Sequence, residues 1–120
     1  MRVGRIRNLP APPVDGPASD TWGITIQRLT PDSNNQRVSI VHVARGARNR
    51  LPAHDCEQVL TGLAGRGIVA TETEQATLGE GDYALIGAFE KHLHGATDDS
   101  ESTQLQVTWM DTKETAILNK

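Results

Sequence analysis

Residues 46–95 read GARNRLPAHDCEQVLTGLAGRGIVATETEQATLGEGDYALIGAFEKHLHG, and this stretch decides the fold. His54 and Gln58 lie near its start, and His92 and His94 lie close together about forty residues later. Between the two pairs are short apolar alternations that glycines separate. We therefore predict a small β domain that brings the two pairs together around a metal ion.

The apolar residues alternate with polar ones at a period of two, which is typical of β-strands. Ile24 and Ile26 share one face of a strand that begins near Trp22. Further runs of this kind cover residues 38–44, 58–63, 67–71, 75–78, 83–86, 92–94 and 104–109. Glycines mark most of the turns, and no segment has the period of a long amphipathic helix. Many short strands predict an all-β barrel or sandwich.

Composition limits the possible partners. A chain of 120 residues, 37% of them hydrophobic, suffices for one core. The formal net charge is −3 without any run of like charges, so we expect neither a nucleic acid nor a membrane as partner. A single cysteine cannot form an intrachain disulfide, and the first residues lack the apolar segment of a secretory signal. These features favour the cytoplasm.

The first twenty residues differ from the rest of the chain. They contain Pro10, Pro12, Pro13 and Pro17, which favour an extended backbone and oppose a helix. We predict an extended N-terminal arm over residues 1–20, lying over the domain or across a partner subunit. Residues 21–120 then form a single domain.

Two motifs in the central stretch resemble those of the cupin family. The segment from Gly46 to Gly65 is similar to the first cupin motif, in which a glycine precedes His-x-His and an acidic or amide ligand follows. The segment from Gly81 to His92 is similar to the second motif, which begins with Gly-Asp and ends with a metal-binding histidine. The resemblance covers about half of the chain. It implies a cupin-type double-stranded β-helix, the jelly-roll barrel.

The end of the second motif resembles one subgroup in particular. Residues 90–96 read EKHLHGA, where that subgroup has Glu-Lys-His-Trp-His-Gly-Ala. These small single-domain cupins use Gln in the first motif, bind manganese, iron or a similar ion, and include hydroxynitrile lyases and proteins with oxidative cleavage activity. The resemblance implies His54, Gln58 and His92 as metal ligands, with His94 beside the ion as a catalytic general base.

The chain departs from the motifs at several positions. Pro52, which has no side-chain donor atom, stands where the first histidine of His-x-His is expected. Gly87 and Phe89 replace a proline and a glycine, so we expect an altered loop path there, and Leu93 replaces an aromatic residue. We hypothesise that His42 fills the coordination gap that Pro52 leaves. The alternative is a half-buried histidine bonded to a backbone carbonyl.

The residue types support such a site without the resemblance. His92 and His94 are two residues apart, so a strand points both side chains to one face. Imidazoles and an amide oxygen suit manganese, iron, nickel or zinc, and the identity of the ion stays open. With an ordinary pKa of about 6.5, His94 would accept a proton at neutral pH. Gln104 and Thr108 share a face of the last strand and are candidate substrate contacts. Structural roles remain open for all of them, including Gln58 bonded to a neighbouring strand.

Three classes of function follow. The first is a metal-dependent enzyme that acts on a small organic substrate by Lewis-acid lyase or dioxygenase chemistry. The second is a non-catalytic cupin that binds a small ligand and has a degraded metal site. The third, a sugar-phosphate isomerase or epimerase, is disfavoured because no cluster of basic residues is aimed at the pocket. The resemblance to cupins also implies a homodimer that pairs through edge strands and exchanges N-terminal segments. We expect an interior formed by Ile40, Val59, Leu60, Ile86 and Leu105.

Overall fold

The structure is a computed structural model that describes residues 1–14, 22–51 and 56–110. Its elements in order are η1 (Ile6–Asn8, a 3-10 turn), β1 (Ile24–Arg28), β2 (Gln36–Val43), β3 (Arg48–Leu51), β4 (Gln58–Gly65), β5 (Gly67–Thr71), β6 (Gln75–Leu78), β7 (Tyr83–Ile86), β8 (His92–Ala96) and β9 (Ser102–Trp109). The described ranges contain no α-helix, and no helix in them has the length and apolar character of a membrane span.

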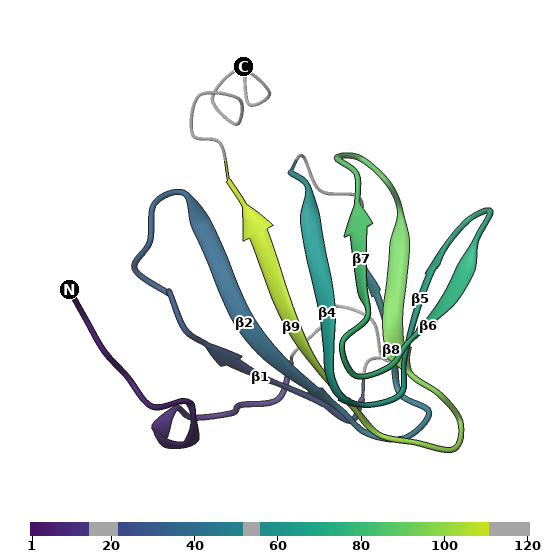
Figure 1. Ribbon diagram of the computed structural model, residues 1–120, viewed down its shortest axis with the longest axis horizontal. Helices are drawn as coiled ribbons and strands as arrows, with labels where there is room; N and C mark the ends of the chain where they lie inside the picture. Colours follow the sequence, from purple (N-terminus) through teal and green to yellow (C-terminus); the bar gives the residue numbers. More distant parts are fainter. Residues whose placement is uncertain (15–21, 52–55, 111–120) are drawn as a thin grey trace.

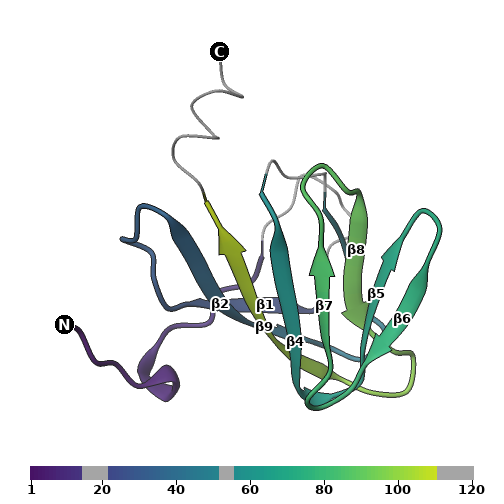
Figure 2. The same cartoon turned by 45° about the horizontal axis from the view of Figure 1, so that its top comes forward.

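The strands form two antiparallel sheets that face each other (Figure 1). The larger sheet has the order β1-β2-β9-β4-β7, and the smaller sheet has the order β3-β8-β5-β6. The sheets come together at the lower end of the view, whereas the β1–β2 and β5–β6 hairpins diverge at the upper end (Figures 1 and 2). The prediction of an all-β barrel is confirmed.

Most of the predicted β runs coincide with strands, but β3 was not predicted. Its four residues include two arginines and an asparagine and show no apolar alternation. In the structure β3 pairs along its whole length with β8, with Arg48 opposite Gly95 and Leu51 opposite His92. The neighbouring strand, rather than local propensity, therefore makes this segment a strand.

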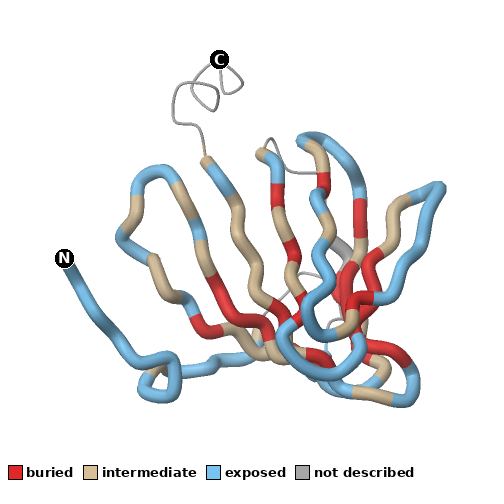
Figure 3. The backbone as a smooth tube through the Cα atoms, in the orientation of Figure 1, coloured by how far each residue is buried: buried red, intermediate tan, exposed pale blue. Residues whose placement is uncertain are grey.

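Two buried apolar clusters lie between the sheets, and Figure 3 shows buried residues gathered where the sheets meet. One cluster joins the two sheets through Leu60, Val69, Leu78 and Ile86. The other consists of Ile24, Val41, Val43, Ala47 and Ala96. The predicted interior positions Leu60 and Ile86 are thus confirmed.

Ile40, Val59 and Leu105 were expected inside but lie on the outer face of the larger sheet. Each is adjacent in the chain to an inward-facing residue, and successive side chains of a strand point to opposite faces. The outward positions of β2, β9, β4 and β7 that are paired in register carry no charged residue. They are Gln36, Val38, Ile40, His42, Thr103, Leu105, Val107, Trp109, Val59, Thr61, Tyr83 and Leu85.

The N-terminal arm lies against its own domain. Residues 12–14 bond to residues 24–26 of β1 through backbone N–H···O contacts of 2.9 and 3.0 Å. On the outer face of β1, the amide of Gln27 donates to the carbonyls of Ile6 and Leu9 at 2.9 and 3.2 Å. Of the two predicted placements, the structure has the arm over the domain. The predicted boundary between residues 20 and 21 lies outside the described residues.

The loop before β8 contains an unusual backbone conformation. Phe89 has a φ of 64°, in the left-handed region that residues other than glycine rarely adopt. It stands at the position where the resemblance predicts a glycine. Because its side chain is 60% exposed, ring packing gives little compensation for this conformation. The departure from the motif therefore places local strain just before His92.

We predict that Phe89→Gly is more stable than Phe89→Ala by about 1 kcal/mol in free energy of unfolding. Both variants lose the ring, but only alanine keeps a Cβ in the left-handed conformation. Urea denaturation of the two purified variants measures the difference. Equal stabilities would show that the backbone at this position stores no strain.

Candidate functional site

Two histidines of the smaller sheet meet two glutamines of the larger sheet inside the barrel. His92 and His94 lie on one face of β8, and they expose only 6% and 1% of their surfaces. Gln58 begins β4 and Gln104 lies in β9, and both are buried. Each histidine contacts one glutamine, so the site consists of two polar bridges between the sheets.

The first bridge brings two lone-pair atoms together. His92 Nδ1 lies 3.1 Å from Glu90 O, and because a carbonyl only accepts, Nδ1 carries a proton. In the tautomer with this single ring proton, His92 Nε2 has a lone pair, and it lies 3.0 Å from Gln58 Oε1. Gln58 Nε2 donates to Thr108 Oγ1 at 3.2 Å, which keeps Oε1 turned toward the imidazole.

A shared cation would satisfy both atoms. Ligands about 2.1 Å from an ion and at right angles to each other are about 3.0 Å apart, which matches the separation of His92 Nε2 and Gln58 Oε1. A metal-bound histidine also commonly donates its other N–H to a carbonyl, as His92 does to Glu90. The alternative arrangement has the Gln58 amide turned over, so that its NH₂ group donates to His92. The geometry therefore fits a metal ligand pair and also allows a purely structural bond.

The second bridge fixes the tautomer of His94. Its Nδ1 lies 3.3 Å from Gln104 Oε1, and Gln104 Nε2 donates to Gly95 O at 3.0 Å and to Ser102 Oγ at 3.1 Å. Nδ1 therefore carries the proton, and Nε2 keeps its lone pair. This Nε2 is buried and has no hydrogen-bond partner among the described residues. Gly67 makes room for the network, because a Cβ at that position would collide with the Gln104 amide.

The pKa of His94 is lowered to about 4, chiefly by burial and in part by the adjacent His92, while the bond to Gln104 opposes the shift. The ring is therefore neutral at pH 7. The expectation of an ordinary pKa for His94 is corrected, because the buried imidazolium loses its hydration. Such a ring is better suited to accept a hydrogen bond from a substrate or water than to hold a proton.

Two predicted ligands remain, His54 and His42. His54 lies outside the described residues, so its role as a ligand stays a prediction. His42 is on the outer face of β2, because its neighbour Val41 points into the core. Its Nε2 lies 2.6 Å from Oε1 of Gln27, a side chain rather than the backbone carbonyl of the alternative hypothesis. His42 is therefore not positioned to fill the gap left by the proline at position 52.

Gln104 and Thr108 both point into the barrel and orient other residues. Thr108 accepts a hydrogen bond from Gln58, and Gln104 holds His94. Contact of either with a substrate stays a prediction. Among the described residues, no three His, Cys, Asp or Glu side chains are grouped closely enough to hold a metal ion. Of the three ligands that the resemblance implies, the described residues include His92, which offers an imidazole nitrogen, and Gln58, which offers an amide oxygen.

Sequence reasoning missed two arginines on the inner face. Arg28 lies opposite Ser39 in the β1–β2 pair, and Arg37 lies opposite Thr108 in the β2–β9 pair. Arg37 and Val41 lie on the same face of β2, so the alternation along this strand would have predicted an inward-facing Arg37 once Val41 was taken as a core residue. Because both faces of β2 carry apolar residues, the face with Ile40 was taken as the interior instead.

We predict that His94 makes the metal-free protein sensitive to acid. Its pKa is about 4 in the folded state and about 6.5 in the unfolded chain, so the unfolded chain binds a proton first as the pH falls. Stability that is present above pH 6.5 is therefore lost toward pH 4, by about 3 kcal/mol. His94→Gln should lose less stability over this interval in urea denaturation. If the stability of the wild type and of the variant fell equally between pH 6.5 and pH 4, His94 would not be the source of the acid sensitivity.

No protein-family model matches the sequence, and no curated protein matches it. Similar solved structures include a cupin-like protein from Thermotoga maritima, which is 26% identical with a TM-score of 0.73 over 81% of this chain and 77% of that chain. The polyketide cyclase RemF from Streptomyces resistomycificus is 18% identical, with a TM-score of 0.80 over 92% of this chain and 80% of its own. An RmlC-like cupin from Shewanella frigidimarina is 14% identical, with a TM-score of 0.76 over 96% of both chains. These likenesses extend over the whole barrel.

Proposed function

Because this chain is a small cupin by fold, we propose that its barrel binds a divalent metal ion through His54, Gln58 and His92. The supporting observation is the buried pair of lone-pair atoms, His92 Nε2 and Gln58 Oε1, which lie 3.0 Å apart. Glu90 O fixes the proton on the far side of the His92 ring. Manganese, iron, nickel or zinc would accept this donor set, which is one histidine short of the family motif at Pro52.

We propose that the site acts on a small organic substrate by lyase or dioxygenase chemistry. A bound ion supplies Lewis-acid or oxygen chemistry at such a site. His94 Nε2 would accept a hydrogen bond from the substrate, because Gln104 holds the ring proton on Nδ1 and leaves Nε2 with a lone pair. Leu60 and Ile86 exclude water from the neighbouring interior. The similar fold of RemF, a polyketide cyclase, supports a small-molecule role.

The second candidate is a non-catalytic cupin that binds a small ligand. Pro52 favours it, because the loss of one histidine weakens a metal site, and the bond between His92 and Gln58 is satisfied without an ion if the amide turns over. For either function we propose a cytoplasmic location, because the single cysteine at position 56 cannot form an intrachain disulfide.

We predict that the full chain binds about one divalent ion and that His92→Ala and Gln58→Leu each weaken binding at least about tenfold. Manganese, iron(II), nickel and zinc are titrated into chelator-treated protein by isothermal titration calorimetry. His42→Ala is the matched control, because this imidazole lies on the outer face. His54→Ala tests the ligand outside the described residues. No binding by the wild type, or equal binding by the His92 and His42 variants, would refute the metal site.

The metal-loaded protein separates the two enzyme classes. Cleavage of cyanohydrins supports a lyase, and oxygen uptake on alkenes or enols supports a dioxygenase. Each activity should fall in His94→Leu, which removes the buried acceptor, while metal affinity should stay within about threefold. A protein that binds metal but performs neither reaction would favour the binding function.

We also propose a homodimer through the outer face of the larger sheet. Tyr83, Leu85 and Trp109 on that face are 74%, 60% and 57% exposed. Because the paired outward positions carry no charge, two copies can pack there without burying unpaired ions. Twisted sheets pack face to face, and a two-fold axis lets each copy use the same residues. Since residues 12–14 pair with β1 of their own chain, we do not base the dimer on exchanged arms.

We predict that Leu85→Glu converts a dimer to a monomer at micromolar concentration, because the dimer would bury an unpaired carboxylate. Sedimentation velocity measures the oligomeric state. Val3→Glu is the control, since Val3 is 68% exposed and lies in the N-terminal arm rather than in a strand of the sheet. A monomeric wild type, or a dimeric Leu85→Glu variant that is folded by circular dichroism, would refute this interface.

A further inference from the structure

Two arginines meet at the open end of the barrel, on the inner face of the larger sheet. Arg28 ends β1 and Arg37 lies near the start of β2. They help to line a hollow of about 330 Å³. Its other lining residues are Thr30, Pro31, Ser33, Val38, Ser39 and Met110. The hollow therefore combines two cationic side chains with hydroxyl groups and a few apolar groups.

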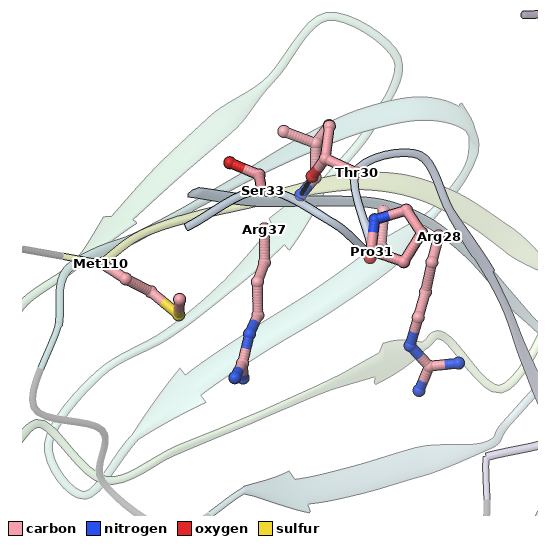
Figure 4. A pocket seen from close by; sticks show the side chains of 8 residues that line it. Arg28, Thr30, Pro31, Ser33, Arg37 and Met110 are labelled. Atoms are coloured by element: carbon pink, nitrogen blue, oxygen red, sulfur yellow. Dashed lines mark hydrogen bonds between the residues drawn. The ribbon is translucent and has the colours of Figure 1, made fainter. Parts of the chain in front are cut away.

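The two arginine side chains extend in the same direction. In Figure 4 both guanidinium groups reach toward one side of the hollow, and Met110 lies on the far side of Arg37 from Arg28. A planar guanidinium presents N–H donors in a fork that matches the two oxygens of a carboxylate. Two such forks in one hollow are suited to an organic anion.

Neither arginine has its charge neutralised within the described part of the chain. Arg2, Arg48 and Arg66 each form an ion pair with an aspartate, at 2.9, 3.5 and 3.9 Å. Arg28 and Arg37 have no hydrogen-bond or ion-pair partner among the described residues. Two unpaired positive charges that share a hollow attract an anion and repel each other until one binds.

The strand register connects this hollow to the proposed metal site. Arg37 stands opposite Thr108 of β9, and Thr108 stands opposite Gln58 of β4. Neighbouring strands are about 4.8 Å apart, so the backbone of Arg37 lies roughly 10 Å from that of Gln58 on the same inner face. Thr108 lies between Arg37 and Gln58 on this inner face, and it bonds the Gln58 amide that faces His92. A small molecule held at the arginines could extend toward His92.

We propose that Arg28 and Arg37 bind the carboxylate of a small organic acid, and that this acid is the substrate or ligand of the barrel. The second half of the proposal rests on the proposed function, whereas binding of the anion does not. A sugar-phosphate isomerase or epimerase was disfavoured because the sequence shows no cluster of basic residues, but the folded chain does place two arginines at one hollow. The apolar side chains of Pro31 and Met110 suit the carbon skeleton of an organic acid better than inorganic phosphate.

The test uses the full chain, treated with chelator, and isothermal titration calorimetry with succinate. Succinamide is the neutral probe, and inorganic phosphate is the inorganic anion. Succinate should bind at least tenfold more tightly than either. Arg28→Gln and Arg37→Gln should each weaken succinate binding at least tenfold. Arg45→Gln is the matched control, because it removes the same charge from an exposed position outside the hollow, and it should stay within twofold.

Two further measurements keep the test decisive. His92→Ala should lose metal binding yet bind succinate as the wild type does, so failure of the metal site leaves the anion result standing. In nitrogen-15 NMR spectra of the wild type, the Nε–H signals of Arg28 and Arg37 should shift when succinate is added. This measurement needs no variant, so it tests the proposal even if the arginine variants do not fold. The proposal would be overturned if the wild type did not bind succinate, or if its arginine Nε–H signals did not shift with succinate. It would also be overturned if the Arg28, Arg37 and Arg45 variants bound succinate equally, or if phosphate bound more tightly than succinate.

Discussion

The contact between histidine and glutamine side chains across the two sheets is the constraint on which the interior depends. Four buried polar side chains carry a large desolvation cost unless each finds a partner, and here the partners come from the opposite sheet. The pairing therefore requires β8 to keep its register against β3 and β5. A slip by one residue would turn both imidazoles outward and leave two buried amides without partners.

The two bridges are chemically different although the same residue types form them. The amide of Gln104 is fully engaged by Gly95 and Ser102, so its oxygen must face His94. Apart from its contact with His92, the amide of Gln58 bonds the Thr108 hydroxyl among the described residues, and a hydroxyl can donate as well as accept. The first arrangement is fixed and keeps a lone pair in the interior. The second can turn over, which allows it to change partner when an ion arrives.

Much of the fold could be predicted from the sequence, because period-two alternation and glycine turns mark most of the strands. The face that lies inside could not be predicted for β2, because Ile40 and Val41 are both buried although they point in opposite directions. One error of this kind misplaced His42 as a ligand and concealed Arg37 as an inner-face residue. The altered pKa of His94 was also beyond the sequence, because it depends on burial between two sheets. The proposed pairing of His92 with Gln58 rested on motif spacing, and the structure places the two side chains in contact.

The buried amide of Gln27 links three parts of the chain that are distant in sequence. Its oxygen accepts a hydrogen bond from His42 Nε2 on one side, and its NH₂ group donates to the carbonyls of Ile6 and Leu9 on the other. These contacts hold the arm in place, and the backbone of residues 12–14 bonds to the hydrogen-bonding edge of β1. If the arm were cleaved, that edge would become a template on which a strand from another molecule could add. The backbone bonds of residues 12–14 thus cover a strand edge that would otherwise be open to strand addition.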